Sequence, residues 1–178
     1  MLTDIAMSSS GELYGVSFNT LFKIDANDAR TVKVGSLGRG DINALTFTAD
    51  GQLLAAGFAG KGVYSVNLDT AQMSLVGDFG ARAAGDLSMH EGQIYLSTNE
   101  GDLRTMDYVD GKLSQEYTIV AQVDRLTYGL ASQEGELYTV VGTELNHVQD
   151  EGNTVLVDLA DHGMATIYGM SEGALRTL

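Results

Sequence analysis

Basic side chains recur at a regular interval in this sequence and could form an anion-binding ring. Arg39, Arg82 and Arg125 are separated by two equal steps of 43 residues, Lys61 lies between the first two arginines, and His162 lies in the next corresponding segment. A guanidinium group can bind a carboxylate, phosphate or sulfate through parallel hydrogen bonds. These five residues are therefore the predicted ligand-binding set.

A second interpretation of the arginines stays open. An aspartate lies within four residues of each one, at positions 41, 86 and 124. Solvated ion pairs between such neighbours are common and contribute little stability. The arginines would then serve local pairing and not the binding of a ligand.

The residue types that most catalytic centres require are scarce. The chain has no cysteine and three histidines, His90, His147 and His162, which are 57 and 15 residues apart. It has no G-x-S-x-G motif and no nucleophile with an evident base. The sequence predicts no catalytic residues, no metal ligands and no cofactor, although its 24 acidic residues leave a carboxylate-pair hydrolase open.

A glycine-closed turn followed by an apolar run occurs five times along the chain. The turn glycines are Gly11, Gly51, Gly92, Gly135 and Gly173, at steps of 40, 41, 43 and 38 residues. A period near forty that is built from strands and turns is typical of a β-propeller.

A second segment repeats in phase with these turns. Residues 21–38 (LFKIDANDARTVKVGSLG) and 63–80 (VYSVNLDTAQMSLVGDFG) align without a gap at an offset of 42 residues. Each unit thus has four short apolar runs bounded by Gly, Asp, Asn and Ser, as expected for strands. We predict an all-β protein, a β-propeller of four complete four-stranded blades plus a C-terminal half-blade. A β-sandwich also uses short strands, but it would not require this offset.

The predicted domain is a single propeller over residues 1–178. Its units span residues 2–40, 41–82, 83–122 and 123–163, and residues 164–178 supply the first two strands of a fifth unit. A half-blade leaves an unpaired strand edge. We therefore expect closure against the first blade, a homo-oligomer formed through residues 164–178, or a longer native chain.

Composition limits the partners and the compartment. The net charge of −14 argues against a nucleic-acid partner, and no apolar run reaches the 18 residues of a membrane span. The N-terminal residues MLTDIAM lack the charged and apolar regions of a signal peptide. A strongly acidic protein suits an extracellular, surface or virion setting, which is favoured over the cytoplasm.

The two rims of the predicted propeller differ in charge. The turns between strands one and two and between strands three and four lie on one rim, which is strongly acidic. The opposite rim is formed by the connections between strands two and three and by those that enter the innermost strands. It carries Arg39, Lys61, Arg82 and Arg125 among acidic residues, and we call it the arginine rim.

Residues 13–38 (LYGVSFNTLFKIDANDARTVKVGSLG) and 53–80 (LLAAGFAGKGVYSVNLDTAQMSLVGDFG) resemble the repeats of bacterial and phage propellers of the YVTN/NHL-like kind. The resemblance covers nearly the whole chain and implies the propeller architecture. It implies no catalytic residues, because such domains are often surface or scaffold modules.

The sequence favours a non-enzymatic binding or scaffold propeller that contacts a protein or a small anionic ligand through the arginine rim. Three alternatives stay open. One is a carbohydrate-binding lectin that stacks sugars on Tyr14, Tyr95 and Tyr138, although such tyrosines can equally pack between blades. Another is a structural subunit whose half-blade is completed by a neighbouring chain. The last is a lactonase or other hydrolase acting in the central channel.

Overall fold

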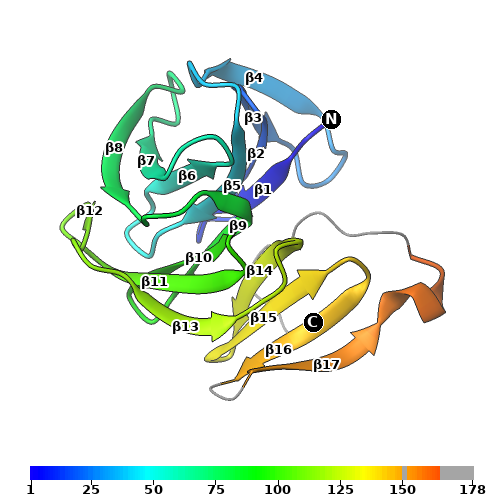
Figure 1. Cartoon of the computed structure of the whole chain (residues 1–178). Coiled ribbons are helices and arrows are strands. Elements are labelled where there is room, and N and C mark those ends of the chain that lie inside the picture. The colour runs from blue at the N-terminus through cyan, green and yellow to red at the C-terminus, as the bar shows by residue number, and fades with distance from the viewer. Residues whose placement is uncertain (150–151, 165–178) are drawn as a thin grey trace.

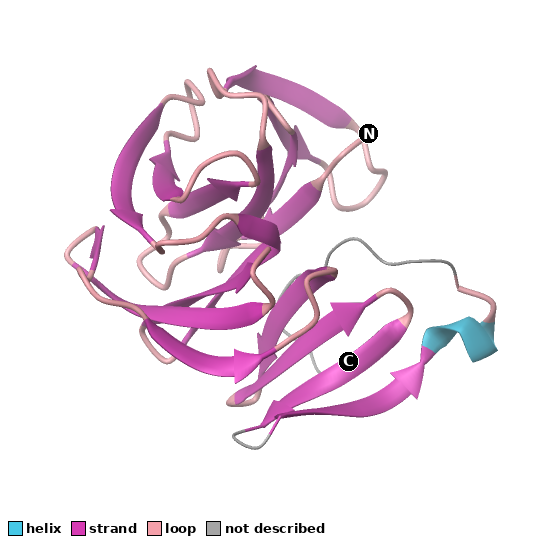
Figure 2. Cartoon of the chain, in the orientation of Figure 1, coloured by secondary structure: helices cyan, strands magenta, loops and turns pink. Residues whose placement is uncertain are grey.

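The computed structural model describes residues 1–149 and 152–164 as four antiparallel sheets (Figures 1 and 2). In each sheet the strands follow one another in chain order. The first sheet, blade 1, consists of β1 (Asp4–Met7), β2 (Leu13–Ser17), β3 (Thr20–Ile24) and β4 (Thr31–Ser36). Blade 2 consists of β5 (Ile42–Phe47), β6 (Leu53–Gly57), β7 (Gly62–Val66) and β8 (Met73–Asp78).

The second half of the chain repeats this plan with one addition. Blade 3 consists of β9 (Ala83–His90), β10 (Gln93–Thr98), β11 (Asp102–Val109) and β13 (Thr118–Gln122), with the short strand β12 (Lys112–Leu113) paired to the end of β11. Blade 4 consists of β14 (Thr127–Gln133), β15 (Glu136–Val141), β16 (Glu144–Gln149) and β17 (Gly152–Asp158). A single turn of 3₁₀ helix, η1 (Leu159–His162), follows β17. The sequence pattern did not predict β12 or η1.

The glycine turns have the backbone conformation that the repeat requires. Gly11, Gly51, Gly92 and Gly135 have φ values of +84°, +84°, +83° and +85°. This left-handed region is strained for residues that have a Cβ atom, so the turn favours glycine. A left-handed glycine therefore closes the turn between the first two strands of every blade.

Packing between the innermost strands arranges the four sheets as the blades of a propeller. β1 packs against β5, β5 against β9 and β9 against β14, and Figure 1 shows the blades following one another around these strands. Within the described residues, no packing of similar extent joins β14 back to β1. The predicted all-β propeller with four four-stranded blades is confirmed.

Some predictions about the chain's extent are not tested. Each sheet lies within one of the four predicted units, but the boundaries of the domain stay predictions. The expected half-blade, residues 164–178, lies outside the described residues apart from Met164. Among the residues that the structure describes, no helix is long and apolar enough to cross a bilayer.

One strand irregularity occurs at the same place in every blade. Where the outermost strand pairs with its neighbour, the register skips one residue, which is the signature of a β-bulge. The skipped residues are Val34, Val76, Val120 and Leu156. The sequence repeat did not reveal this bulge.

The bulged residues fill the spaces between blades. Each of the three interfaces combines a bulged valine with an aliphatic side chain from the innermost strand of the next blade. The pairs that share a core cluster are Val34 with Leu45, Val76 with Leu87, and Val120 with Leu130. We call the side of a blade that carries the bulged residue its forward face, and the opposite side its back face.

Two buried aspartates tie the innermost strands together. The Asp4 carboxylate on β1 accepts a hydrogen bond from its neighbouring amide at 2.8 Å and another from the Leu45 amide on β5 at 2.6 Å. The Asp86 carboxylate on β9 accepts from its own neighbouring amide at 2.7 Å and from the Leu130 amide on β14 at 2.8 Å. The side chains of Asp4 and Asp86 are also hydrogen bonded to each other.

The environment of Asp4 favours its neutral form. Burial raises the pKa of this carboxyl well above its ordinary value, and the hydrogen bonds from the Leu45 and Ile5 amides and with Asp86 offset only part of the rise. Two carboxyl groups can hydrogen bond to each other only when at least one carries a proton.

Candidate binding rim

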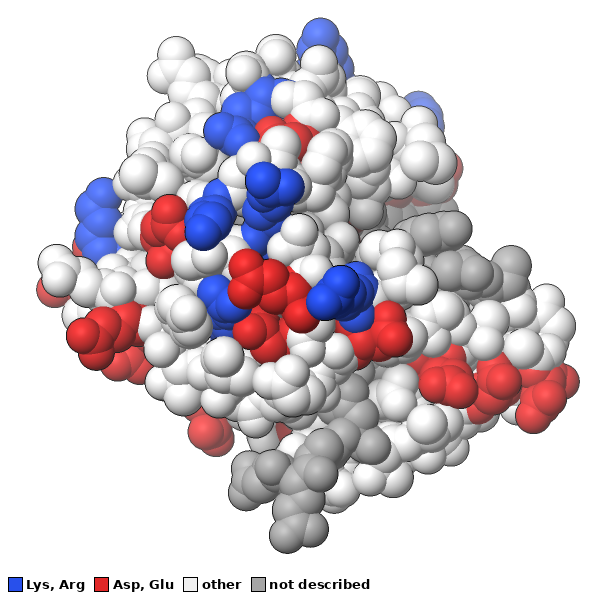
Figure 3. All heavy atoms as spheres, in the orientation of Figure 1, with Lys and Arg blue, Asp and Glu red and all other residues white. Residues whose placement is uncertain are grey.

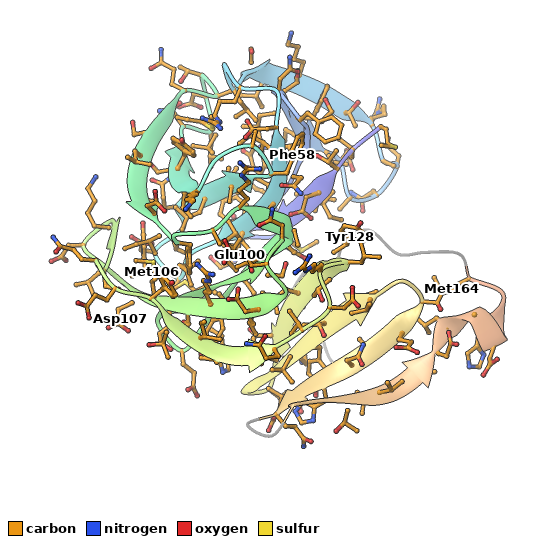
Figure 4. All side chains as sticks on the ribbon, in the orientation of Figure 1. Phe58, Glu100, Met106, Asp107, Tyr128 and Met164 are labelled. Atoms are coloured by element: carbon orange, nitrogen blue, oxygen red, sulfur yellow. The ribbon has the colours of Figure 1, made fainter. Side chains whose placement is uncertain are left out.

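The predicted site residues lie on connections between strands. Arg39 precedes β5, Lys61 precedes β7, Arg82 precedes β9 and Arg125 precedes β14. Figure 4 places Phe58, from the same connection as Lys61, and Glu100, from the connection between β10 and β11, near the centre of the view. In the same orientation, Figure 3 shows Lys and Arg atoms interleaved with acidic atoms around that centre.

Arg39 is held by a neighbouring carboxylate. Its Nε and Nη2 donate to the two oxygens of Asp41 at 2.9 and 2.7 Å, and its Nη1 donates to the Tyr64 hydroxyl at 3.2 Å. Asp41 also accepts from the Ala59 amide at 3.1 Å. Burial would raise the pKa of Asp41, but the hydrogen bonds and charge of Arg39 together with the Ala59 amide lower it. At this position the geometry is that of local pairing.

Arg82 and Arg125 flank a single turn between β10 and β11. The Asn99 amide donates to the Arg82 carbonyl at 3.1 Å. On the other side, Gly101 has a φ of +90°, and a Cβ atom built on it would lie 3.2 Å from Cγ of Arg125. Both arginine residues are exposed, so this turn lies between two solvent-accessible arginines.

The aspartates expected to pair with these two arginines have other hydrogen-bond donors. Asp86 is buried between the innermost strands and accepts backbone amides there. Asp124 accepts from the Leu126 amide at 2.7 Å. In the described part of the chain, no ion pair involves Lys61, Arg82 or Arg125. The local-pairing geometry seen at Arg39 is therefore not repeated at Arg82 and Arg125.

A buried arginine that the sequence analysis missed supports this turn. Arg104 on β11 is only 3% exposed. Its Nη2 donates to Asp102 at 3.0 Å and also to Glu100, and its Nη1 donates to the Phe79 carbonyl at 3.0 Å. Its guanidinium lies over the Tyr117 ring at 4.3 Å. Burial would lower the pKa of Arg104, but hydrogen bonds with Asp102 and Glu100 raise it, so the group keeps its charge.

Two aromatic side chains on this rim were also missed. Phe18 and Phe58 occupy equivalent repeat positions, and their rings meet edge to face with centroids 5.7 Å apart. They are 40% and 45% exposed. Phe18 has a φ of +46°, a conformation that costs a residue with a Cβ atom about 1–2 kcal/mol. An exposed aromatic in a strained conformation is typical of a contact surface.

His162 lies apart from the arginines. It belongs to η1, which follows the outermost strand of blade 4. Figure 1 shows this turn at the outer edge of the molecule, far from β1, β5 and β9. The structure therefore brings Arg82 and Arg125 to one turn but does not bring His162 to them.

The repeated tyrosines are engaged in packing or stacking. Tyr14 is 4% exposed and lies against Phe47, with ring centroids 5.9 Å apart, and Tyr95 is 9% exposed. Tyr138 stacks on His147 at 5.3 Å. Among the described residues, no group of three or more His, Asp or Glu side chains is arranged to hold a metal ion.

Comparison with known proteins supports the fold. No family model and no curated protein matches the sequence. A Bacteroides thetaiotaomicron protein of unknown function is similar with a TM-score of 0.70 at 15% identity, over 94% of this chain and 53% of that one. A Xanthomonas campestris gluconolactonase is similar with a TM-score of 0.63 at 17% identity, over 86% of this chain and 61% of that one. A Staphylococcus aureus virginiamycin B lyase is similar with a TM-score of 0.59 at 12% identity, over 85% of this chain and 54% of that one.

These similarities concern architecture. The similar structures are β-propeller proteins, and at such identities the likeness shows the fold alone. The chain spans between 53% and 61% of the length of these three structures. The propeller part of the family resemblance is confirmed, whereas no sequence match supports its YVTN/NHL-like part.

Proposed function

We propose that this chain is a binding propeller whose arginine rim docks an acidic polypeptide segment that also carries apolar side chains. The observation that carries the proposal is the pair of exposed arginine residues, Arg82 and Arg125, on either side of the turn anchored by Arg104. Guanidinium groups recognise carboxylates through directional, charge-assisted hydrogen bonds. The Asn99 amide, which donates to the Arg82 carbonyl, holds the backbone of Arg82 against this turn.

The partner class follows from the second feature of the rim. Phe18 and Phe58 offer exposed aromatic surface beside Lys61, which lies in the same connection as Phe58. Binding energy at protein interfaces is concentrated in aromatic and arginine side chains. A polypeptide supplies carboxylates and apolar groups over the width of several connections, whereas a small anion would use only the arginines.

An enzymatic function is the second candidate. The similar structures include a gluconolactonase and a virginiamycin B lyase, and the propeller fold hosts both enzymes and binding proteins. Among the described rim residues, the arginines and phenylalanines supply no nucleophile with an adjacent base. The geometry of the rim therefore favours binding over catalysis.

The proposal is tested with a fluorescein-labelled peptide of alternating Glu and Leu, whose binding is followed by anisotropy. Replacing both Arg82 and Arg125 by Glu should weaken binding by at least about tenfold, because a hydrogen bond to a charged group is worth about 1.5–3 kcal/mol. Arg30→Glu is the matched control, since Arg30 is 79% exposed on the opposite rim and pairs with Asp28. Equal loss in the control, or no binding by the unmodified chain, would refute the proposal.

A further inference from the structure

The two ends of the blade series each leave one repeat position uncovered. On the innermost strands, Leu45, Leu87 and Leu130 are only 2%, 2% and 1% exposed. The residue at the equivalent position of β1 is Ile5. It pairs with a residue of β2, just as each leucine pairs with a residue of the second strand in its own blade. Ile5 is 38% exposed. Among the described residues, no blade covers the back face of blade 1 as the preceding blade covers each of the other back faces.

The forward face of blade 4 has the matching property. The bulged residue Val76 is 7% exposed where blade 3 covers it, and Val34 and Val120 also pack into interfaces. The corresponding bulged residue of blade 4, Leu156, is 52% exposed. Thus, within residues 1–149 and 152–164, one half of the repeating interface is open at each end of the series.

More apolar surface surrounds the open back face of blade 1. Leu2 and Met7 are 38% and 39% exposed. A shallow hollow of about 320 Å³ next to them is lined by Leu2, Phe22 and Thr31, together with Met1 and Ser17. Contiguous apolar surface of this kind marks an interaction site.

We propose that the back face of blade 1 binds the forward face of blade 4 of a second copy of this chain. The described blades form this interface three times, between blades 1 and 2, 2 and 3, and 3 and 4. The two open faces are therefore complementary halves of an interface the sequence already encodes. The contact is independent of ligand binding at the arginine rim.

Two copies joined at both ends would close into one ring. Contacts between different surfaces either close by rotation or continue as a filament. The four described blades of each copy together give eight, which is within the range of about four to eight blades found in propellers. Closure would cover the faces that the described blades leave open at the two ends of each copy, so we expect a dimer and not a filament.

Charge also favours head-to-tail contact. Residues 2–40 contain four acidic and four basic side chains, whereas residues 123–163 contain eight acidic side chains and one basic side chain. Contact between two copies of blade 4 would bring like charges together, which opposes association. Contact between blade 4 and the neutral blade 1 avoids this repulsion.

The test is the solution mass of the full chain, measured by light scattering across a range of concentrations. A dimer is expected, and Ile5→Lys or Leu156→Lys should each convert it to a monomer. Val109→Lys is the matched control, since Val109 is 63% exposed at the end of β11 and on neither open face. Circular dichroism checks that each variant keeps its sheet content.

Charge exchange and labelling make the result decisive. Mixing Ile5→Glu with Leu156→Lys chains should restore association that neither variant shows alone. Because the chain has no cysteine, Ile5→Cys can be labelled selectively, and it should react more slowly than Val109→Cys. A monomer at every concentration overturns the proposal. It does so even if Ile5→Cys reacts slowly, because other residues of the same chain would then be what covers this position. A dimer that both lysine variants leave intact also overturns it.

Discussion

The carboxyl groups of Asp4 and Asp86 are hydrogen bonded to each other although they belong to the first and third blades. Each also accepts an amide of the blade that follows its own, through Leu45 and Leu130. Two side chains thus hold all four innermost strands. Their mutual hydrogen bond requires a proton, so the centre of this propeller is sensitive to pH.

The first prediction concerns the pH dependence of stability. The pKa of Asp4 is raised in the folded protein. The stability that its protonated carboxyl contributes is therefore fully present below the pKa that Asp4 has in the unfolded chain, and it is lost as the pH rises through the pKa of Asp4 in the folded protein. Asp4→Asn cannot ionise. The difference in unfolding free energy between the unmodified chain and Asp4→Asn should therefore fall as the pH is raised above about 4.

Urea unfolding of both chains between acidic and neutral pH measures this difference. Comparing the two chains isolates Asp4 from carboxyls such as Asp41, whose lowered pKa gives stability that is lost as the pH falls. A difference that does not change with pH would show that Asp4 does not bind the proton.

A second prediction concerns the buried cation under the rim. Arg104→Met removes the partner of Asp102, which is 6% exposed. Removing one member of a buried pair leaves an uncompensated charge and typically costs about 3–5 kcal/mol. The same change at Arg30, whose ion pair is exposed, should cost less than about 1 kcal/mol. Chemical denaturation of the two variants gives the comparison, and equal losses would contradict the assignment.

A third prediction tests the strained aromatic on the rim. Phe18→Asn relieves the left-handed backbone conformation, which Asn tolerates, but it loses the contact with Phe58, worth about 0.5–1.5 kcal/mol. The net change in stability should stay within about 1 kcal/mol. Affinity for the acidic peptide should nevertheless fall several-fold. A large loss of stability with unchanged affinity would show that Phe18 serves folding.

A fourth prediction concerns the bulge. Val76 points between blades 2 and 3 and is 7% exposed, whereas its neighbour Leu75 is 57% exposed. Val76→Ala should cost about 1.5–2.5 kcal/mol, because it removes two buried carbon atoms. Leu75→Ala removes more atoms but should cost less than about 0.5 kcal/mol. Thermal and urea unfolding measure both losses of stability. A larger loss for Leu75→Ala than for Val76→Ala would show that Leu75, and not Val76, packs in the interface.

Local signals in the sequence predicted the strands and turns well. Gly11, Gly51, Gly92 and Gly135 each occupy a left-handed conformation that the turn itself requires, so their spacing reported the blades directly. The bulged residues escaped notice because Val34 and Val76 look like any other apolar strand residues. Only the pairing register shows that each is skipped.

The candidate site was harder to predict because its contacts are distant in sequence. Arg39 and Asp41 are close along the chain, and their pairing was foreseen as one of two interpretations. Arg104 lies in an ordinary strand pattern, and its bond to the Phe79 carbonyl spans 25 residues. The Asp4 and Asp86 contact spans two blades. Such relationships depend on how blades pack, which periodicity alone does not specify.

The bulge shared by β4, β8, β13 and β17 also bears on solubility. These outermost strands are the sheet edges, and a straight edge strand offers free amides and carbonyls to a strand from another molecule. An extra residue near the middle of each edge interrupts that template and increases the local twist. The same residues that fill the gaps between blades thereby discourage the growth of continuous intermolecular sheets.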